Sequence, residues 1–299
     1  MNELDAAGIT DPVLRASYEE CKRLNSLHGK TYYLATLLLP AHKRPFVHAL
    51  YGFARYADEI VDDLASTLSD QEKAAHLKTW GDSVLASIST GISTDHVGAA
   101  LIDTVRRFNI PQQHFVDFLH SMTMDLTVST YRTYENLMEY VYGSAAVIGL
   151  QMVPILWPLS DGAYEPAKKL GIAFQLANFI RDVGEDLDRG RIYLPLDELA
   201  QFGVTKEMLH DRKITPQIIE ALKFQIERVR QLQREAAPGI ALLEESSRPC
   251  ISAASTLYCG IVDEVEKIGY DVFNKRAKTS TARRIRVALP AFIRAISAR

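Results

Sequence analysis

The chain has 299 residues, of which 47% are apolar, and its formal net charge at pH 7 is -3. This composition allows a large buried core, and the small negative charge argues against a dedicated nucleic-acid binder. No linker, repeat or low-complexity block divides the sequence, so we expect one domain over residues 1–299. Three cysteines without metal-ligand spacing and an N-terminus without signal-peptide features favour a cytoplasmic protein.

Hydrophobic periodicity predicts helices along almost the whole chain. Their borders carry typical signals: Ser69 and Glu72 form a capping box, Pro111 opens one helix, and Thr215 with Pro216 opens another. Alternating patterns typical of β-strands are absent, so the predicted fold class is an all-α bundle whose sites form between facing helices. The predicted helices cover residues 11–27, 40–63, 69–90, 94–108, 111–129, 133–157, 163–188, 214–245, 247–271 and 279–296.

Residues 140–160 contain no charged side chain and are long enough to cross a bilayer. They also contain Gly143, Gly149, Pro154 and Pro158, and no strong basic anchor flanks them. We therefore expect a central core helix, with a membrane span as the alternative.

Two predicted helices carry oxygen-bearing side chains at a spacing of four residues. Asp58 and Asp62 share one helix face, as do Asn178, Asp182 and Asp186. Stacked carboxylates repel one another, so their presence on largely apolar helices predicts a cation between them. Hard oxygen ligands suit Mg²⁺, with Mn²⁺ as an alternative, bridging the protein to a diphosphate. A solvated acidic helix face is the structural alternative for the first pair.

A hollow bundle with acids at one end and apolar lining below them suits a long hydrocarbon diphosphate. Its charged head would lie at the acids and its tail inside the bundle. This is the layout of an isoprenoid synthase, in which a water-excluded, aromatic-lined cavity protects an allylic carbocation.

The sequence resembles the squalene/phytoene synthase family, and most of all its bacterial phytoene synthases. Five blocks carry the resemblance in the family's order, and weaker matches follow at Tyr258 and at residues 270–276. One departure is Thr31-Tyr32, where the family often has Ser-Phe. The five blocks are residues 28–40, 51–63, 140–149, 175–186 and 189–195.

The resemblance implies head-to-head condensation of two prenyl diphosphates, with geranylgeranyl diphosphate favoured and phytoene as product. It implies metal binding by Asp58, Asp62, Asn178, Asp182 and Asp186, and a role for Tyr140 and Tyr193 in the second ionisation or the final proton loss. It implies catalytic roles for Arg55 and for the four aspartates. The implied substrate-binding residues are His28, Gly29, Lys30, Thr31, Tyr51, Arg55, Gln175, Arg181, Tyr258 and Arg276.

Several alternatives stay open at this stage. A relative that uses C15 substrates to make dehydrosqualene, squalene or hydroxysqualene shares the metal motifs. The sequence has no Gly-rich dinucleotide-binding fingerprint, which disfavours the NADPH-dependent reduction of squalene synthases. A class I terpene cyclase also spaces its second metal motif by four residues. A non-enzymatic assembly factor is disfavoured because the acids are intact. Tyr51, Tyr140 and Tyr258 could instead be core tyrosines, and Arg189 and Arg191 could cap a helix.

Two further expectations concern substrate length and membranes. Small residues between Gly143 and Gly149 predict a cavity wall that admits a C20 chain, which a bulky residue at Ala146 or Gly149 would shorten. After Asp271 the chain has eight basic residues and no acidic one. This tail predicts peripheral contact with anionic lipid, with a solvated face or a phosphate contact by Arg276 as the alternative.

Overall fold

The computed structural model describes residues 2–62, 67–93 and 95–298, apart from the side chain of Asp62. Across these ranges all regular elements are helical, and extended segments pair only at two isolated bridges. The predicted all-α fold class is therefore confirmed.

The α-helices are α1 (Glu3–Ala6), α2 (Pro12–His28), α3 (Lys30–Thr36), α4 (Arg44–Asp62), α5 (Asp70–Thr90), α6 (Gly98–Phe108), α7 (Gln113–Met124), α8 (Tyr134–Val141), α9 (Val147–Ile155), α10 (Tyr164–Asp188), α11 (Leu196–Gln201), α12 (Lys206–His210), α13 (Pro216–Ala236), α14 (Arg248–Cys259), α15 (Ile261–Lys267) and α16 (Thr281–Ser297).

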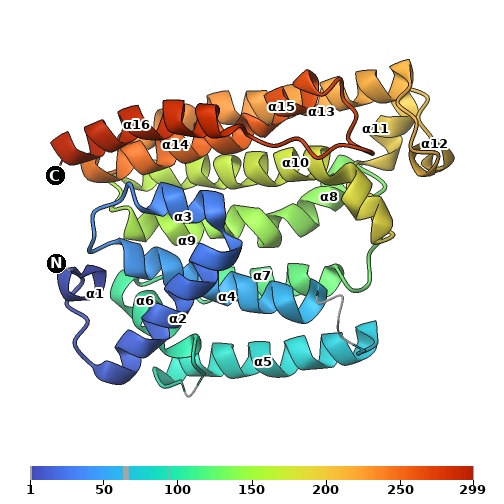
Figure 1. Ribbon diagram of the computed structural model, residues 1–299. Helices are drawn as coiled ribbons and strands as arrows, with labels where there is room; N and C mark the ends of the chain where they lie inside the picture. The colour runs from blue at the N-terminus through green and yellow to red at the C-terminus, as the bar shows by residue number, and fades with distance from the viewer. Residues whose placement is uncertain (1, 63–66, 94, 299) are drawn as a thin grey trace.

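Most long helices run nearly parallel or antiparallel to one another (Figure 1). Helix α10 lies inside the bundle, packed on α13 on one side and on α9 on the other, and α4 packs on α2, α5 and α9. Helices α14 and α16 pack together at the outer edge. The long helices thus face one another within a bundle, as predicted.

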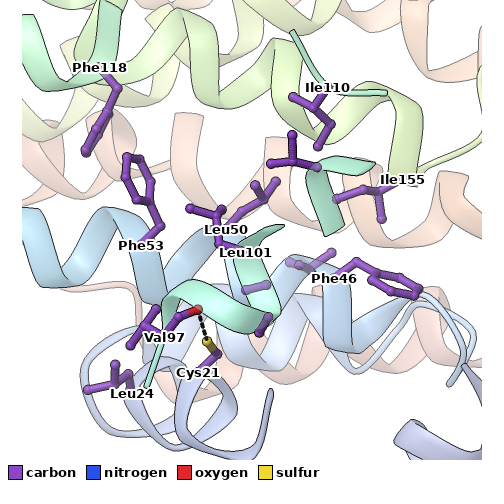
Figure 2. Packing of buried hydrophobic residues seen from close by; sticks show 14 of the residues in the cluster. Cys21, Leu24, Phe46, Leu50, Phe53, Val97, Leu101, Ile110, Phe118 and Ile155 are labelled. Carbon is purple, nitrogen blue, oxygen red and sulfur yellow. Dashed lines mark hydrogen bonds between the residues drawn. The ribbon is translucent and has the colours of Figure 1, made fainter. Parts of the chain in front are cut away.

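The packing around α4 shows what holds the first half of the chain together. Phe53 is fully buried and its ring lies 5.4 Å from Trp80, 5.3 Å from Phe115 and 5.2 Å from Phe118. Figure 2 shows Phe53 and Phe118 pointing toward each other from facing helices. Burying one such side chain contributes about 1.5–3 kcal/mol, so this aromatic cluster fixes α4 against α5 and α7.

Helix borders follow the local signals where caps are strong. Ser69 and Glu72 form the expected capping box, and the Thr215 side chain caps α13 with Pro216 in its first turn. The predicted helix over 247–271 is interrupted at Gly260, and that over 214–245 continues after Ala236 as a 3₁₀-helix, Ala237–Leu242. Helices α3, α11 and α12 were not predicted, since each has seven residues or fewer and too little periodicity.

The uncharged segment 140–160 forms core helix as far as Ile155, with a local change of hydrogen bonding. It comprises the end of α8, a π-helical turn over Tyr142–Ala146, and α9. A Cβ atom on Gly143 would lie 2.1 Å from the Asp117 carbonyl oxygen, so this glycine permits close approach of α7. Among the described residues no helix is long and apolar enough to cross a membrane.

Candidate functional site

Two adjoining cavities lie between the facing helices. One, of about 350 Å³, is polar and the other, of about 300 Å³, is mostly apolar. Five lining residues belong to both, so the two cavities form one continuous space with a polar end and an apolar end. The shared residues are Tyr51, Ala54, Phe118, Ser144 and Gln175.

The predicted acidic motifs meet at the polar end. Asp58 on α4 lines the same cavity as Asn178, Asp182 and Asp186 on α10. The spacing of four residues therefore places the three α10 side chains on one face, toward α4. The side chain of Asp62 lies outside the described residues, although its backbone continues α4.

Arginines pair with these acids. Arg55 Nη1 lies 2.6 Å from Asp58 Oδ2, and its Nε lies 3.1 Å from Glu59 Oε1. Arg181 forms two hydrogen bonds to Asp182, and Arg276 Nε lies 3.2 Å from Asp182 Oδ1. Guanidinium groups placed in this way are suited to phosphate oxygens, because each presents a fixed fork of donors.

Two features show where a cation would fit. Asn178 Oδ1 is buried without a hydrogen-bond partner, although buried polar atoms normally have one. Burial, followed by the nearby Asp182 carboxylate, raises the pKa of Asp186 to about 8. Burial outweighs the opposing effect of Arg189 and Arg191 on Asp186, so a cation in the cavity would stabilise the charged carboxylate. The same cation would give Asn178 Oδ1 a partner.

The donor set also limits how a metal would be held. Among the described residues no three His, Cys, Asp or Glu side chains cluster closely enough to hold one ion by themselves. A hard cation here would complete its shell with water and substrate phosphate oxygens, as Mg²⁺ commonly does. The residues therefore fit a cation that bridges protein and diphosphate, not one held in a protein cage.

Asp125, which sequence reasoning missed, organises the predicted tyrosines. It follows α7, and its two carboxylate oxygens accept hydrogen bonds from Tyr140 at 2.7 Å and Tyr193 at 2.8 Å. Arg191 donates to the Asp125 backbone carbonyl at 2.9 Å. Burial, and then the Asp125 charge, raise the pKa of both tyrosines, so both hydroxyls keep their protons. No spacing motif marks Asp125, because its partners lie 15 and 68 residues away.

Aromatic rings form one wall of the polar cavity. Phe179 stacks on Tyr193 with ring centroids 4.1 Å apart, and Tyr140 lies 5.5 Å from Tyr193. Tyr131, another residue that sequence reasoning missed, stacks on Tyr193 with ring centroids 6.0 Å apart. Such ring faces stabilise nearby positive charge, including that of a carbocation.

The predicted loop at residues 28–31 contributes unevenly. A Cβ atom on Gly29 would lie 2.6 Å from the Tyr51 ring, so glycine allows Tyr51 to pack there. His28 Nε2 lies 3.7 Å from Glu59 Oε1, beside the Arg55 cluster. None of residues 28–31 is among the residues that line either cavity.

Tyr258 and Tyr32 contact each other, although only Tyr32 lines a cavity. Their ring centroids are 4.5 Å apart, and Phe174 lies 4.8 Å from Tyr258 on its other side. Burial raises the pKa of Tyr258, with Tyr32 adding to the effect. The residue that departs from the family pattern therefore lines the apolar cavity directly.

The apolar cavity extends away from the acids. From Ser144 at the shared end to Leu156 at the far end is twelve residues, or about 18 Å along helical backbone. The far end is lined by Leu156, Ala163, Ile240 and Leu243. This length is comparable to that of a prenyl chain.

The expected wall residues differ in their placement. Ala146 is fully buried and is not among the cavity-lining residues. Gly149 lines the cavity, but a Cβ atom on it would lie 2.4 Å from the Ala167 carbonyl oxygen on α10. The small residues here therefore let α9 approach α10, and Ala146 is not part of the wall.

The chain was compared with known proteins. The family model described as squalene/phytoene synthase matches residues 26–283. A phytoene synthase of Arthrospira platensis is 38% identical over 278 residues, covering 89% of each chain. A 15-cis-phytoene synthase of Synechococcus elongatus is 37% identical over 284 residues, covering 91% of each chain. The crystal structure of a dehydrosqualene synthase with ligand matches at a TM-score of 0.86 and 28% identity, covering 95% of this chain and 98% of that one.

Proposed function

This chain belongs to the squalene/phytoene synthase family and is a prenyltransferase, and we propose that it condenses two geranylgeranyl diphosphates to phytoene. The observation that carries the proposal is the continuous space described above, with arginines and acids at one end and about 18 Å of apolar lining beyond them. A diphosphate head fits the first part and a prenyl tail the second.

The reaction has two ionisations. In the first, one substrate loses diphosphate, and its C1 cation is attacked by the double bond of the second substrate. Loss of a proton gives a cyclopropylcarbinyl diphosphate, prephytoene diphosphate. In the second, that compound loses diphosphate, rearranges and loses a proton to give the linear hydrocarbon.

We assign the binding of diphosphate to Arg55 and Arg181, with Arg276, Gln175 and Tyr51 beside them. The arginines now pair with Asp58 and Asp182. When substrate binds, their guanidinium forks would turn toward phosphate oxygens, which offer more acceptors than a carboxylate. Gly29 supports this end through Tyr51, Tyr258 through Tyr32, and His28 through Glu59 beside Arg55. We keep Lys30 and Thr31 as peripheral contacts.

We assign the metal to Asp58, Asp62, Asn178, Asp182 and Asp186. Mg²⁺, or Mn²⁺ in its place, would neutralise the diphosphate and so make it a better leaving group. We expect no NADPH requirement. Tyr140 and Tyr193, with protons directed to Asp125, would keep ring faces and oxygen lone pairs toward the developing cation during the second ionisation.

A second candidate is a C15-using synthase. It is favoured by the structural match to a dehydrosqualene synthase, whereas the sequence relatives at 37–38% identity are phytoene synthases. The two differ in the length of tail that the apolar cavity accepts. A terpene cyclase has no comparable observation in its favour.

The test is mass analysis of hydrocarbon formed with Mg²⁺ from geranylgeranyl and farnesyl diphosphate, offered separately and then at equal concentration. Phytoene as the main product supports the proposal. Only C30 products from the equal mixture would contradict it and favour the second candidate. We further propose one domain over residues 1–299 and a cytoplasmic location at the inner face of a membrane.

A further inference from the structure

Helix α16 carries an exposed apolar stripe that its contacts do not explain. Ile285, Leu289, Phe292, Ile293 and Ile296 recur at intervals of four, three, one and three residues, so they share a face roughly 100° wide. Each is between 47% and 60% exposed. No other described helix has more than two large apolar side chains exposed to this degree.

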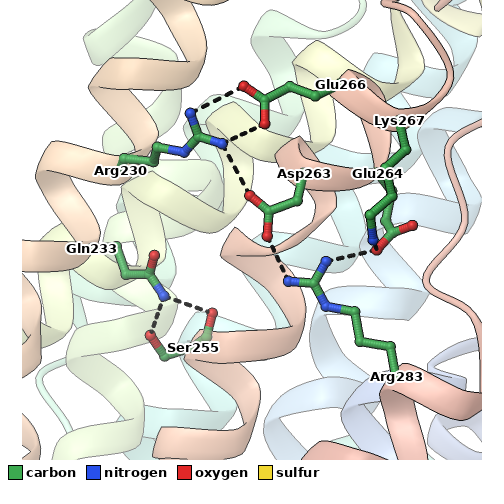
Figure 3. Close-up of polar contacts among 8 residues, drawn as sticks. All are labelled: Arg230, Gln233, Ser255, Asp263, Glu264, Glu266, Lys267 and Arg283. Atoms are coloured by element: carbon green, nitrogen blue, oxygen red, sulfur yellow. Dashed lines mark hydrogen bonds and ion pairs between the residues drawn. The ribbon is translucent and has the colours of Figure 1, made fainter.

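The stripe is held outward by firm contacts on other sides of the helix. Ala291 and Ala295 are buried, and α16 packs on α14 at the outer edge of the bundle (Figure 1). Arg283, in the first turn, donates to Asp263 and Glu264 at 2.6 Å each (Figure 3). The helix is therefore docked in one orientation, and the stripe is a fixed surface feature.

Charge identifies the kind of surface that would cover the stripe. Residues 272–299 contain eight basic side chains and no acidic one, while the whole chain has a net charge of -3. Arg286 follows Ile285 by one residue and so lies about 100° round the helix, at the border of the stripe. Arg286 and Arg294 are both exposed. A second copy placed on this face would bring like charges together, because a two-fold interface opposes each patch to itself.

We propose that α16 is an interfacial helix that binds this protein to an anionic phospholipid bilayer, with its apolar stripe among the acyl chains and Arg286 at the headgroups. An amphipathic helix too short to span a bilayer binds in this way, through buried apolar area together with attraction to anionic lipid. Several arginines near the surface each add to the attraction.

Binding through α16 would also place the apolar cavity close to lipid. Cys250, Ile251 and Ala254 of α14 line that cavity, and α16 packs on the same helix. The hydrocarbon tail would thus lie one helix away from the membrane. This last step rests on the proposed function, because only a greasy substrate or product makes such proximity useful.

The experiment measures flotation of the full chain with vesicles of phosphatidylcholine alone and of phosphatidylcholine with phosphatidylglycerol. We expect binding to the anionic vesicles that weakens as salt rises.

Leu289→Ser with Phe292→Ser should lower the partition coefficient on the order of tenfold, through the lost apolar burial. Arg286→Glu should lower it for anionic vesicles. The matched control is Val13→Ser with Ile92→Ser, two apolar residues that are even more exposed elsewhere, and it should bind normally.

Stripe variants that float as well as the unchanged chain would overturn the proposal, as would equal binding to neutral vesicles. A lipid-free dimer that the stripe variant converts to monomer would overturn it in favour of self-association. Circular dichroism verifies that each variant is folded. Turnover in detergent micelles is measured separately, so failure to form hydrocarbon there contradicts the proposed function and leaves the vesicle result unaffected.

Discussion

The polar and apolar cavities share five lining residues but differ in how their side chains are satisfied. At the polar end, carboxylates and guanidiniums pair with one another, Asn178 Oδ1 has no partner, and the pKa of Asp186 is raised by burial and by Asp182. At the apolar end most lining side chains are hydrophobic, although Asn25 Oδ1 there and Ser144 Oγ at the shared end also lack a hydrogen-bond partner. The polar end is therefore organised for a ligand at some cost in stability, while the apolar end acts mainly through its shape.

The largest expected effect is at the polar end. Asp58→Ala or Asp182→Ala should lower turnover on the order of a thousandfold or more, because neither variant can complete the bridge between protein, cation and diphosphate. Helical content should be unchanged. Hydrocarbon formation with Mg²⁺ measures the loss, and Asp188→Ala is the control, since Asp188 lies near the end of the same helix and pairs at the surface with Arg212. Full activity in excess EDTA would contradict metal dependence.

Asp186 should reveal the stability cost of the polar end. Its folded-state pKa of about 8 lies above the ordinary value of 3.8, so the folded state holds this proton more tightly than the unfolded state does. Its stabilising contribution is complete below about pH 4 and is lost as pH rises toward 8. Asp186→Asn should remove this loss and raise the free energy of unfolding at pH 8 on the order of 5 kcal/mol.

The measurement is urea unfolding at pH 4 and pH 8 in EDTA. Asp186→Asn should match the unchanged protein at pH 4 and exceed it at pH 8, while Asp188→Asn should match it at both. A gain of equal size at both pH values would point to packing and exclude ionisation as the cause. We expect no such gain from Asp182→Asn, because Arg181 and Arg276 already balance the charge of Asp182.

The two ends also differ in how far sequence could predict them. The spacing of Asn178, Asp182 and Asp186 predicted a shared face, because i, i+4 geometry is local to one helix. The position of Asp125 was not predictable, since its role depends on Tyr140 and Tyr193 brought in from distant segments. Periodicity and caps predicted the long helices well for the same local reason.

The wall of the apolar cavity was harder to predict than its existence. Small residues around Gly149 indicated space, but a glycine in a helix makes room for a ligand or for another helix, and sequence does not distinguish the two. The structure shows helix approach at Gly143 and Gly149. The interruption at Gly260 was missed for a related reason, since the apolar pattern continues through it into α15.

Asp125→Asn should separate positioning of the tyrosines from binding of substrate. The amide keeps the size of the side chain but loses the charge that two hydroxyls donate to, so Tyr140 and Tyr193 should lose their fixed orientation. We expect turnover to fall roughly 10- to 30-fold, within the range for general positioning and electrostatic effects, with accumulation of prephytoene diphosphate and little change in KM. Asp117→Asn on α7, whose carboxylate binds Gln113, is the control. A raised KM without accumulated intermediate would show that Asp125 acts in binding instead.

The smallest expected effect is a change of substrate length at the far end of the apolar cavity. Ala163 lines that end together with Leu156 and Leu243, about 18 Å of helix away from the polar end. A phenyl ring at this position would remove about 5 Å of depth, roughly one helical turn and one isoprene unit. Ala163→Phe should therefore shift the preference from geranylgeranyl toward farnesyl diphosphate on the order of tenfold, the usual size of discrimination by a hydrophobic pocket.

Two control variants accompany this one. Met152→Leu, which keeps the volume of a lining residue, should leave the preference unchanged. Gly149→Phe should lower thermal stability because its ring would meet the α10 backbone. Product analysis with both substrates at equal concentration measures the substrate preference, and thermal midpoints measure the stability of each variant. An unchanged C40 product from a stably folded Ala163→Phe would show that the tail ends before this wall, and that the polar end alone sets which substrate is used.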